Sequence, residues 1–477
     1  MLKALDLLPA HTLSEHGLDV FDPATGDKVA TVKTYAANEV ETLIGRAEQA
    51  MADWAQRPAK ARAKILQQWF QALENNKEAL ATLMTAECGK PINESRGEVG
   101  YGASFVEWFA EEAKRVYGDI VPTHAEGKRI LVLRQPIGVC AAITPWNFPL
   151  AMITRKVAPA LAAGCPILVK PAEATPLTAL AMEHLAHEAG IPEAVFRVVP
   201  TDQPAELGTL FCQSQIIRKL SFTGSTEVGR LLMRQSADNI KKLSLELGGN
   251  APFIVFDDAD IDAAVEGAIA SKYRNAGQTC VCVNRFLVQD SIHDEFAERL
   301  AKRVAELKVG VGHQEDTQIG PLINEKARTK VKELLSDAVD QGANIKLGGQ
   351  SVDGAGAYYQ PTVVTGVTQQ MRIAQEEIFG PISTLIRFRD EDEAIQIAND
   401  TIFGLAAYFY ARDLGRVWRV MEALEYGMVG INEGIISTEV APFGGVKQSG
   451  LGREGSRYGI DEYTELKYAL MGGLQAR

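Results

Sequence analysis

The sequence predicts an α/β protein with mostly parallel, doubly wound sheets covered by helices. From about residue 137, short runs of β-branched and aliphatic residues alternate with longer amphipathic stretches, which is typical of such sheets. A second series of the same kind begins near residue 253. The chain of 477 residues also exceeds the size at which a single core keeps growing. We therefore expect two or three domains.

The first quarter of the chain is predicted to be helical. Asn38 precedes an apolar stripe of helical period and Glu41 follows it by three residues, so the two are predicted to form a capping box. The first stripe comprises Val40, Leu43, Ile44, Ala47, Met51 and Trp54, and a second comprises Ile65, Trp69, Phe70 and Leu73. Both indicate core-facing helices without chemistry of their own.

Strands are predicted from residue 130 onwards, and helices alternate with them after the first two. In the first series we predict strands at 130–133, 137–143, 167–169, 195–199 and 219–222, with helices at 176–189 and from Thr226. In the second series we predict strands at 253–256 and 286–288, with helices from Ile261 and near 291–308, 325–341, 391–399 and 413–425. A last strand is predicted from Tyr463.

The composition restricts the classes of function. The formal net charge is −12 at pH 7, whereas a nucleic-acid or anionic-membrane partner requires clustered basic side chains. No stretch approaches the roughly 18 consecutive apolar residues of a membrane span. The first eight residues match neither a signal peptide nor a transit peptide. We expect a cytoplasmic protein with a small-molecule partner.

Cysteine and histidine usage gives no sign of a disulfide framework or a metal site. The six cysteines are irregularly spaced, which fits a reducing compartment. Among the seven histidines, only His184 and His187 are predicted to share a helix face, and no third ligand accompanies them. We expect a solvated surface pair there and no metal.

The stretch from Tyr273 to Cys282 is the candidate reactive site. Cys280 directly follows the residues Gly-Gln-Thr, which are predicted to form a turn. Arg274 precedes Cys280 by six residues, and Cys282 follows it by two. We take Cys280 as the candidate nucleophile. The alternative is that a free cysteine is simply a small buried hydrophobic residue.

Three segments decide between these interpretations: 144–149 (Thr-Pro-Trp-Asn-Phe-Pro), 245–250 (Leu-Glu-Leu-Gly-Gly-Asn) and 277–280 (Gly-Gln-Thr-Cys). Together they resemble the aldehyde dehydrogenase superfamily, and within it the succinate-semialdehyde dehydrogenases. The resemblance runs from about residue 15 to the C-terminus. It implies an aldehyde dehydrogenase-like fold. The expected parts are a Rossmann-type NAD-binding domain (1–121 and 142–247), an α/β catalytic domain (248–448) and a small β oligomerisation arm (122–141 and 449–477).

One glycine-rich motif is not taken as the cofactor site. Residues 450–455 (Gly-Leu-Gly-Arg-Glu-Gly) match the dinucleotide fingerprint G-x-G-x-x-G. That fingerprint works between a strand and a helix that open a βαβ unit, and only 22 residues follow Gly455. We predict an ordinary glycine-rich loop.

The cofactor phosphates are predicted to lie at Gly224 and Ser225. These residues follow a strand and open a helix, so free backbone N–H groups there can face a pyrophosphate. The alternative is an ordinary helix cap. The resemblance supports the cofactor interpretation and also assigns Lys170 to the adenosine ribose.

Glu173 indicates NAD rather than NADP. A carboxylate can accept a hydrogen bond from a ribose 2′-hydroxyl but repels a 2′-phosphate. The resemblance assigns Glu377 and Phe379 to the nicotinamide ribose and ring, although the same segment could be only a turn before a strand. Trp146 and Leu247 complete the predicted cofactor-binding set.

Aldehyde oxidation needs a nucleophile, an oxyanion donor and a base. A Cys280 thiolate would form a thiohemiacetal and then a thioester. An unperturbed thiol is only about 3% ionised at pH 7, so we expect Arg274, the nicotinium ring or backbone N–H groups to lower the pKa of Cys280. By resemblance, Asn147 stabilises the oxyanion, Glu246 activates water and Lys170 assists proton movement. The alternatives are a turn-forming asparagine and a surface carboxylate.

Arg155, Arg274 and Ser437 match positions that hold the distal carboxylate in succinate-semialdehyde dehydrogenases. Guanidinium groups bind carboxylates bidentately, although each arginine alone could form a surface salt bridge. The sequence thus predicts NAD-dependent oxidation of succinate semialdehyde to succinate. Glutarate semialdehyde is the nearest alternative, because one methylene changes pocket energies by only about 1–3 kcal/mol. A non-catalytic protein that retains the fold is an alternative of another class.

Two further expectations come from the resemblance. The arm strands imply a homodimer or a homotetramer. Cys282 is either a packing residue or the partner of Cys280 in a disulfide that closes the site under oxidation. In the second case, dithiothreitol should restore the activity lost to peroxide treatment, and it should do so more fully in the wild-type enzyme than in the Cys282→Ala variant. Equal recovery would exclude the pair.

Overall fold

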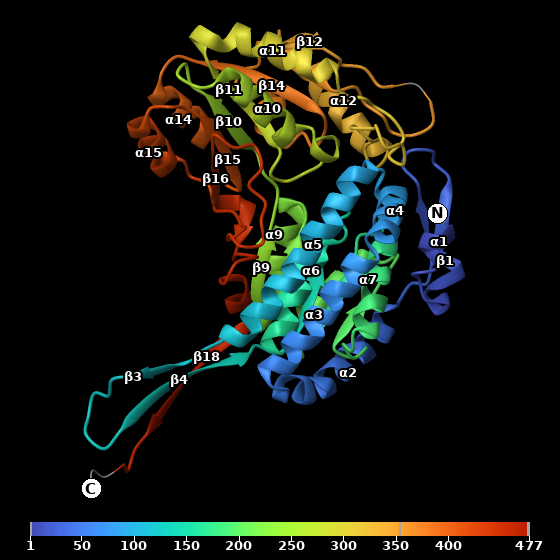
Figure 1. The fold of residues 1–477 in the computed structure, drawn as a ribbon, viewed down its shortest axis with the longest axis vertical. Helices are drawn as coiled ribbons and strands as arrows, with labels where there is room; N and C mark the ends of the chain where they lie inside the picture. The colour runs from blue at the N-terminus through green and yellow to red at the C-terminus, as the bar shows by residue number, and fades with distance from the viewer. Residues whose placement is uncertain (1, 353, 475–477) are drawn as a thin grey trace.

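The computed structural model describes residues 2–352 and 354–474. Within these ranges the chain forms four β-sheets, and helices surround the two larger ones. Figure 1 shows two α/β units stacked on each other, with a long β arm extending from the lower one. This arrangement confirms the predicted fold class.

A helical layer precedes the first large sheet. It comprises α2 (Ala37–Gln56), α3 (Ala59–Asn75), α4 (Lys77–Cys88) and α5 (Ile92–Glu112). Trp54 of α2 and both Trp69 and Leu73 of α3 are fully buried, so the two apolar stripes face the core as predicted. Before this layer lie α1 (Leu2–Leu5) and an unpredicted hairpin, β1 (Leu13–Phe21) with β2 (Lys28–Val32).

The predicted capping box of α2 is wrong by two residues. The helix is capped at Ala36, whose backbone N–H donates to the Glu39 carboxylate at 3.0 Å. Neither Asn38 nor Glu41 makes these bonds, because the chain is already helical at Asn38. Ala36 has the extended backbone that a cap requires, and Glu39 stands three residues after it.

The lower unit is built on a six-stranded sheet in the order β17-β9-β8-β5-β6-β7. Its strands are β5 (Val139–Ile143), β6 (Ile167–Lys170), β7 (Phe196–Val198), β8 (Ile217–Thr223), β9 (Lys242–Glu246) and β17 (Gly450–Leu451). Its helices are α6 (Ala151–Ala163), α7 (Pro176–Glu188), α8 (Pro204–Gln213) and α9 (Thr226–Ser236). All neighbouring strands are parallel except β17, so the carboxyl ends of the parallel strands share one edge.

The upper unit is built on a seven-stranded sheet in the order β12-β13-β14-β11-β10-β15-β16. Its strands are β10 (Ala251–Val255), β11 (Val283–Gln289), β12 (Asn344–Leu347), β13 (Thr362–Thr365), β14 (Ile382–Phe388), β15 (Ala406–Tyr410) and β16 (Met428–Ile431). Its helices are α10 (Ile261–Lys272), α11 (His293–Ala305), α12 (Glu325–Asp340), α13 (Arg372–Gln375), α14 (Glu391–Asn399) and α15 (Leu414–Ala423). Only β12 runs antiparallel to its neighbour.

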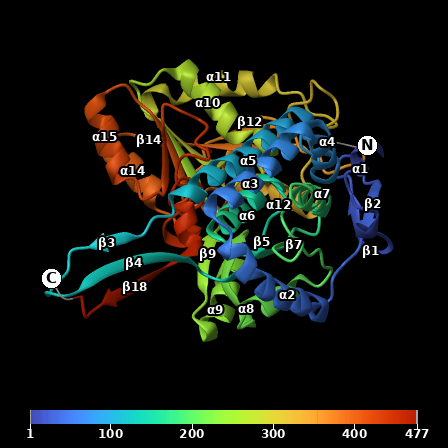
Figure 2. The same ribbon diagram turned by 60° about the horizontal axis from the view of Figure 1, so that its bottom comes forward.

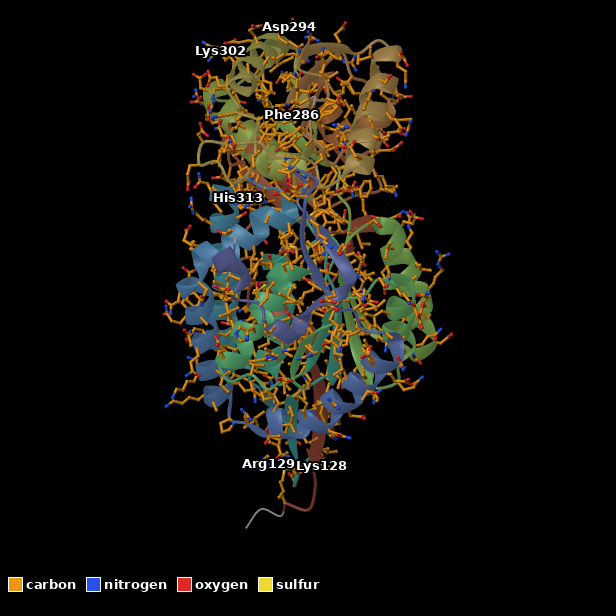
Figure 3. All side chains as sticks on the ribbon, turned by 90° about the vertical axis from the view of Figure 1, so that its right-hand side faces the viewer. Lys128, Arg129, Phe286, Asp294, Lys302 and His313 are labelled. Carbon is orange, nitrogen blue, oxygen red and sulfur yellow. The ribbon has the colours of Figure 1, made fainter. Side chains whose placement is uncertain are left out.

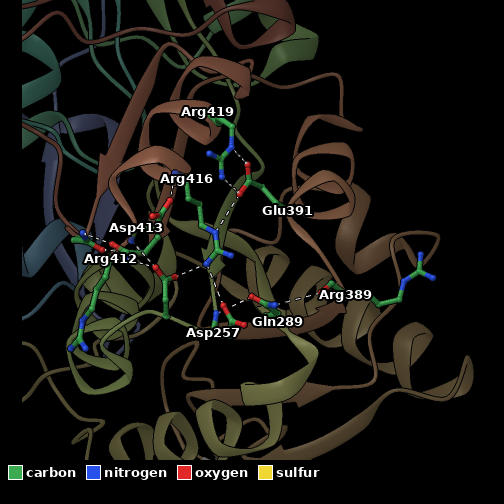
Figure 4. A network of polar contacts seen from close by, with 11 residues as sticks. Asp257, Gln289, Arg389, Glu391, Arg412, Asp413, Arg416 and Arg419 are labelled. Carbon is green, nitrogen blue, oxygen red and sulfur yellow. Dashed lines mark hydrogen bonds and ion pairs between the residues drawn. The ribbon is translucent and has the colours of Figure 1, made fainter.

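A network of charged side chains attaches α14 and α15 to the end of β10 (Figure 4). The Arg416 guanidinium lies 2.6 Å from Asp258 and 3.3 Å from Glu391, and Arg419 lies 2.7 Å from Glu391. Partly exposed ion pairs contribute at most about 1 kcal/mol each. The network therefore mainly orients the two helices at this edge of the sheet.

The arm is an antiparallel sheet in the order β18-β4-β3, formed by β3 (Asp119–Val121), β4 (Arg129–Pro136) and β18 (Thr464–Met471). Figure 2 shows it projecting away from the body, and Figure 3 places Lys128 and Arg129 at the opposite end of the molecule from Phe286. Ile120, Leu466 and Tyr468 are 80, 66 and 59% exposed on it. Apolar side chains in this position indicate a surface that another chain can cover.

The sheets bear on the predicted boundaries of the arm. β5 begins at Val139 in the six-stranded sheet, and β17 also pairs within that sheet. The arm strands are those at 119–121, 129–136 and 464–471, and the predicted bounds of the arm (122–141 and 449–477) remain a prediction. The division into cofactor-binding and catalytic domains remains a prediction.

None of the described helices has both the length and the apolar character needed to cross a membrane. In the same part of the chain, no three His, Cys, Asp or Glu side chains gather in a way that could hold a metal ion. The cytoplasmic location and the lack of a metal remain predictions.

Candidate active site

A cavity of about 290 Å³ is lined by residues from both large units. It lies at the ends of β5, β8 and β9 of the lower sheet and beside the turn between α10 and β11 of the upper one. The predicted site residues that line it are Trp146, Asn147, Arg155, Gly224, Ser225, Glu246, Leu247, Arg274, Cys280, Glu377, Phe379 and Ser437. Most of the constellation predicted from separate motifs is thus brought together.

Cys280 follows an unusual turn. Asn275, Ala276 and Gly277 all have left-handed backbone conformations, with φ of 50°, 53° and 77°. A Cβ at position 277 would lie 2.3 Å from the Gly380 carbonyl oxygen, so the turn requires glycine there. The turn brings Cys280 to the cavity wall, where it is half-buried, while the other five cysteines are buried.

The prediction that the site lowers the pKa of Cys280 is wrong for this structure. Burial raises the pKa of the thiol to about 12, and the Glu377 carboxylate adds to the effect. Arg155 opposes this change, whereas Glu246 reinforces it. The reason is that carboxylates and loss of solvent outweigh the positive charge near the sulfur.

Asn147 lies in the loop after β5 and is buried. Its Nδ2 donates to the Gln278 carbonyl at 2.9 Å, which joins this loop to the cysteine turn. An amide nitrogen has two hydrogens, so one remains for a ligand in the cavity. The Asn147 Oδ1 atom has no hydrogen-bond partner among the described residues.

Glu246 ends β9 and is buried, and neither carboxylate oxygen has a hydrogen-bond partner in the described part of the chain. Burial and the neighbouring Glu454 carboxylate hold its pKa well above the usual range, against the effect of Arg155 and Lys156. The side chain therefore holds its proton to a higher pH than an ordinary carboxyl group and becomes a base only as the pH rises. The predicted alternative of a surface carboxylate does not fit this burial.

The two arginines differ in their surroundings. The Arg155 Nε atom lies 2.5 Å from Glu454 and its guanidinium packs 3.9 Å from the Phe443 ring centroid, so it forms a buried rather than a surface salt bridge. Arg274 lies 5.2 Å from the Phe148 ring centroid, and no carboxylate of the described residues comes within 4.0 Å of it. Arg274 is consequently the cation with more capacity for a ligand.

The cavity also has features that fit a dinucleotide. Ser225 caps α9 by accepting the Val228 N–H at 3.3 Å, which leaves the first N–H groups of that helix directed outward. One Glu377 oxygen accepts the Gly249 N–H at 3.0 Å, so the other can accept from a ribose hydroxyl. Phe379 has a left-handed backbone conformation, with φ of 55°. Its ring meets the Trp146 ring edge-on, with 5.6 Å between the two ring centroids.

Three predicted residues do not line the cavity. Lys170, the last residue of β6, donates to the Pro171 carbonyl at 2.8 Å and pairs at 2.5 Å with Glu173 in the turn that follows. These contacts give no support to a role of Lys170 in proton movement at Cys280. Cys282 is buried, and its Sγ atom lies 3.6 Å from the Lys272 carbonyl, so pairing with Cys280 would require the loop to rearrange.

Sequence reasoning missed several lining residues, among them Tyr101, Phe148, Met152 and Phe443. Phe148 stands in the motif 144–149, which was the available signal for it, whereas Tyr101, Met152 and Phe443 lie outside the three motifs and have no such signal. Glu454 was also missed, although it stands in the glycine-rich segment 450–455. The available signal was an acidic residue inside a glycine-rich segment.

Residues 10–469 match the model of the aldehyde dehydrogenase family, and the chain belongs to that family. It is an aldehyde dehydrogenase, and its relatives use NAD or NADP. It is 57% identical over 455 residues to the succinate-semialdehyde dehydrogenase [NADP(+)] of Escherichia coli, covering 95% of this chain and 94% of the relative. It is also 57% identical to the glutarate-semialdehyde dehydrogenase of Pseudomonas putida, with 94 and 93% covered.

The solved structures give the same result. The succinate-semialdehyde dehydrogenase of Burkholderia pseudomallei superimposes with a TM-score of 0.96 at 58% identity, and the match covers 98% of both chains. The predicted resemblance to this family is therefore confirmed.

Proposed function

We propose that this aldehyde dehydrogenase oxidises succinate semialdehyde to succinate with NAD. The observation that carries the proposal is that Arg155 and Arg274 line the same cavity as Cys280. A substrate with an aldehyde at one end and a carboxylate at the other can meet both kinds of group. A neutral aldehyde would leave the cationic end of the cavity without a partner.

The reaction begins when the Cys280 thiolate attacks the aldehyde carbon and forms a thiohemiacetal. The oxyanion accepts hydrogen bonds from the Asn147 side-chain amide and the backbone N–H of Cys280. When bound, the cofactor supplies the acceptor for the hydride that leaves this carbon. Glu246 then deprotonates a water molecule that opens the resulting thioester to the acid and restores the thiol.

Arg274 is the principal ligand that we propose for the substrate carboxylate. Glu454 already neutralises one side of Arg155, whereas Arg274 has no carboxylate within ion-pair distance in the described part of the chain. Ser437 lines the same cavity and can donate a further hydrogen bond. A fork of donors from these groups fits a carboxylate.

The test compares succinate semialdehyde, glutarate semialdehyde and butanal in wild-type enzyme and in Arg274→Met. We expect kcat/KM in the wild type to be about tenfold or more higher for the acid semialdehydes than for butanal. The variant loses a charged hydrogen bond to the substrate, which is worth about 1.5–3 kcal/mol. Its kcat/KM for the two acid semialdehydes should therefore fall by about 10–150-fold. Butanal, which has no carboxylate, is the matched control, and kcat/KM for butanal should change little in the variant.

If wild-type enzyme uses butanal as well as the acids, the arginines do not bind substrate and the function remains aldehyde oxidation in general. A preference for glutarate semialdehyde would establish the alternative substrate, which the name of the Pseudomonas putida relative supports. One added methylene is a small difference for a cavity of this size.

The choice of NAD rests on Glu173. Its carboxylate pairs with Lys170 in the turn where the resemblance places the adenosine ribose, so it can accept from a 2′-hydroxyl. The Escherichia coli relative, by contrast, is named for NADP. We expect wild-type kcat/KM to favour NAD, and Glu173→Ser to reduce the NAD-to-NADP ratio by about tenfold or more, because like charges across a site repel. A wild-type preference for NADP would contradict this assignment.

We propose that the chain associates as a homodimer or homotetramer through the arm. The exposed Ile120, Leu466 and Tyr468 are the surface that supports this. Light scattering should give two or four times the mass of one chain, and a monomer at micromolar concentration would contradict the proposal.

A further inference from the structure

The turn ahead of Cys280 needs support from outside itself. Asn275 and Ala276 both carry a Cβ and yet have φ of 50° and 53°, a conformation that L-residues rarely adopt. Such a turn persists only where surrounding contacts determine it. The position of the Cys280 thiol, four residues further on, depends on this turn.

Glu94, in the first turn of α5, supplies one of these contacts. Its Oε2 atom accepts the backbone N–H of Asn275 at 2.7 Å, although the two residues are 181 positions apart in the sequence. The side chain of Asn275 in turn donates to the Asn147 carbonyl at 3.1 Å. Glu94 thus reaches both the cysteine turn and, through Asn275, the loop of the oxyanion donor.

The neighbours of Glu94 hold the same two loops. Lys90 pairs with Glu98 and donates to the Asn147 carbonyl at 2.7 Å. Glu98 accepts the N–H groups of Leu150 and Ala151 at 2.9 and 3.2 Å, at the start of α6. The start of α5 and the residues just before it therefore form a polar bracket behind the cavity, and Glu94 is its contact with the cysteine turn.

We propose that Glu94 is a positioning residue for Cys280. By accepting the Asn275 N–H it holds the left-handed turn, and so keeps the thiol opposite the Asn147 amide. The proposal rests on the proposed role of Cys280 as the nucleophile. Glu94 does not line the cavity, so its effect is exerted through the turn and not through contact with substrate.

The test uses Glu94→Ala and Glu94→Gln, with Glu183→Ala as the matched control. Glu183 is buried, whereas Glu94 is partly buried, and like Glu94 it accepts a backbone N–H, that of Val198, at 2.8 Å. It lies on α7 and does not line the cavity. Two readouts are measured for each variant: the single-turnover burst of NADH with butanal, and hydrogen exchange of the peptide that contains the turn.

Glu94→Ala should slow the burst by about tenfold or more, because misplacing a reacting group by about 1 Å can cost as much as 100-fold. The KM for the cofactor should stay close to that of the wild type, and the peptide at 274–282 should exchange faster. Glu94→Gln should recover most of the burst, because its amide oxygen can accept the same N–H. Glu183→Ala should change neither readout.

A wild-type burst and unchanged exchange in Glu94→Ala would overturn the proposal. Equal losses in Glu94→Ala and Glu183→Ala would overturn it too, because they would report general destabilisation. Failure of Glu94→Gln to recover the burst would also overturn the proposal, because the glutamine keeps the acceptor for the Asn275 N–H. Butanal keeps the test independent of the substrate arginines, and a burst that survives Cys280→Ala would instead refute the proposed nucleophile.

Discussion

Cys280→Ala is expected to abolish NADH formation from every aldehyde tested, with a loss of about 10⁴-fold or more in kcat. Removing the nucleophile of a covalent mechanism can cost about 10⁶-fold in rate. No other thiol can replace it, because the remaining five cysteines are buried and none of them lines the cavity. Absorbance of NADH in the steady state and in a single turnover measures the loss.

Cys282→Ala is the matched control, because it removes a thiol two residues away that does not face the cavity. In reducing buffer it should retain most of the wild-type rate. Substantial turnover by Cys280→Ala would refute the covalent mechanism, whereas similar losses in both variants would indicate damage to the loop.

The raised pKa of Cys280 gives this prediction a second measurement. With a pKa of about 12 in the protein alone, the thiol is protonated at neutral pH, so its alkylation by iodoacetamide should rise with pH up to that value. Addition of NAD should accelerate alkylation at a fixed pH, because a positive charge beside the sulfur favours the thiolate. Equal rates with and without NAD would show that the thiol is activated in another way.

Much of the fold could be predicted from the sequence because local patterns decide it. The strand at 219–222 and the helix from Thr226 appear as β8 and α9, since an apolar run and a helix-capping Ser225 are local signals. The hairpin β1-β2 was missed because β1 is mostly exposed and neither strand alternates clearly between buried and exposed residues.

The site residues were predicted from sequence motifs. Motifs do not show which charged side chains from other segments surround the site. The sequence shows Arg274 near Cys280, but it does not show that the thiol is buried or that Glu377 and Glu246 approach the sulfur from distant segments. The predicted direction of its pKa was therefore wrong. Similarly, the pairing of Arg155 with Glu454 joins positions 299 residues apart. Such contacts depend on tertiary packing alone.

Glu246→Gln is expected to separate the two halves of the reaction. Cys280 can still attack the aldehyde and form the thioester, so the first turnover should give a burst of NADH of near-stoichiometric size. Thioester hydrolysis then lacks its base, and the steady-state rate should fall by about 10²–10⁴-fold. Loss of the burst together with the steady-state rate would assign Glu246 to the first half instead.

The environment of Glu246 also fixes the sign of the pH dependence. Burial and Glu454 hold its pKa well above the usual carboxyl range, so the basic form accumulates only as the pH rises, and wild-type turnover limited by hydrolysis should increase with pH. Glu454→Gln removes a negative neighbour and leaves Arg155 and Lys156 unneutralised, and both changes lower the pKa of Glu246. The profile of the steady-state rate should therefore move to lower pH in Glu454→Gln, while Glu246→Gln should lose this pH dependence. A shift to higher pH in Glu454→Gln would mean that Glu246 is not the group that titrates.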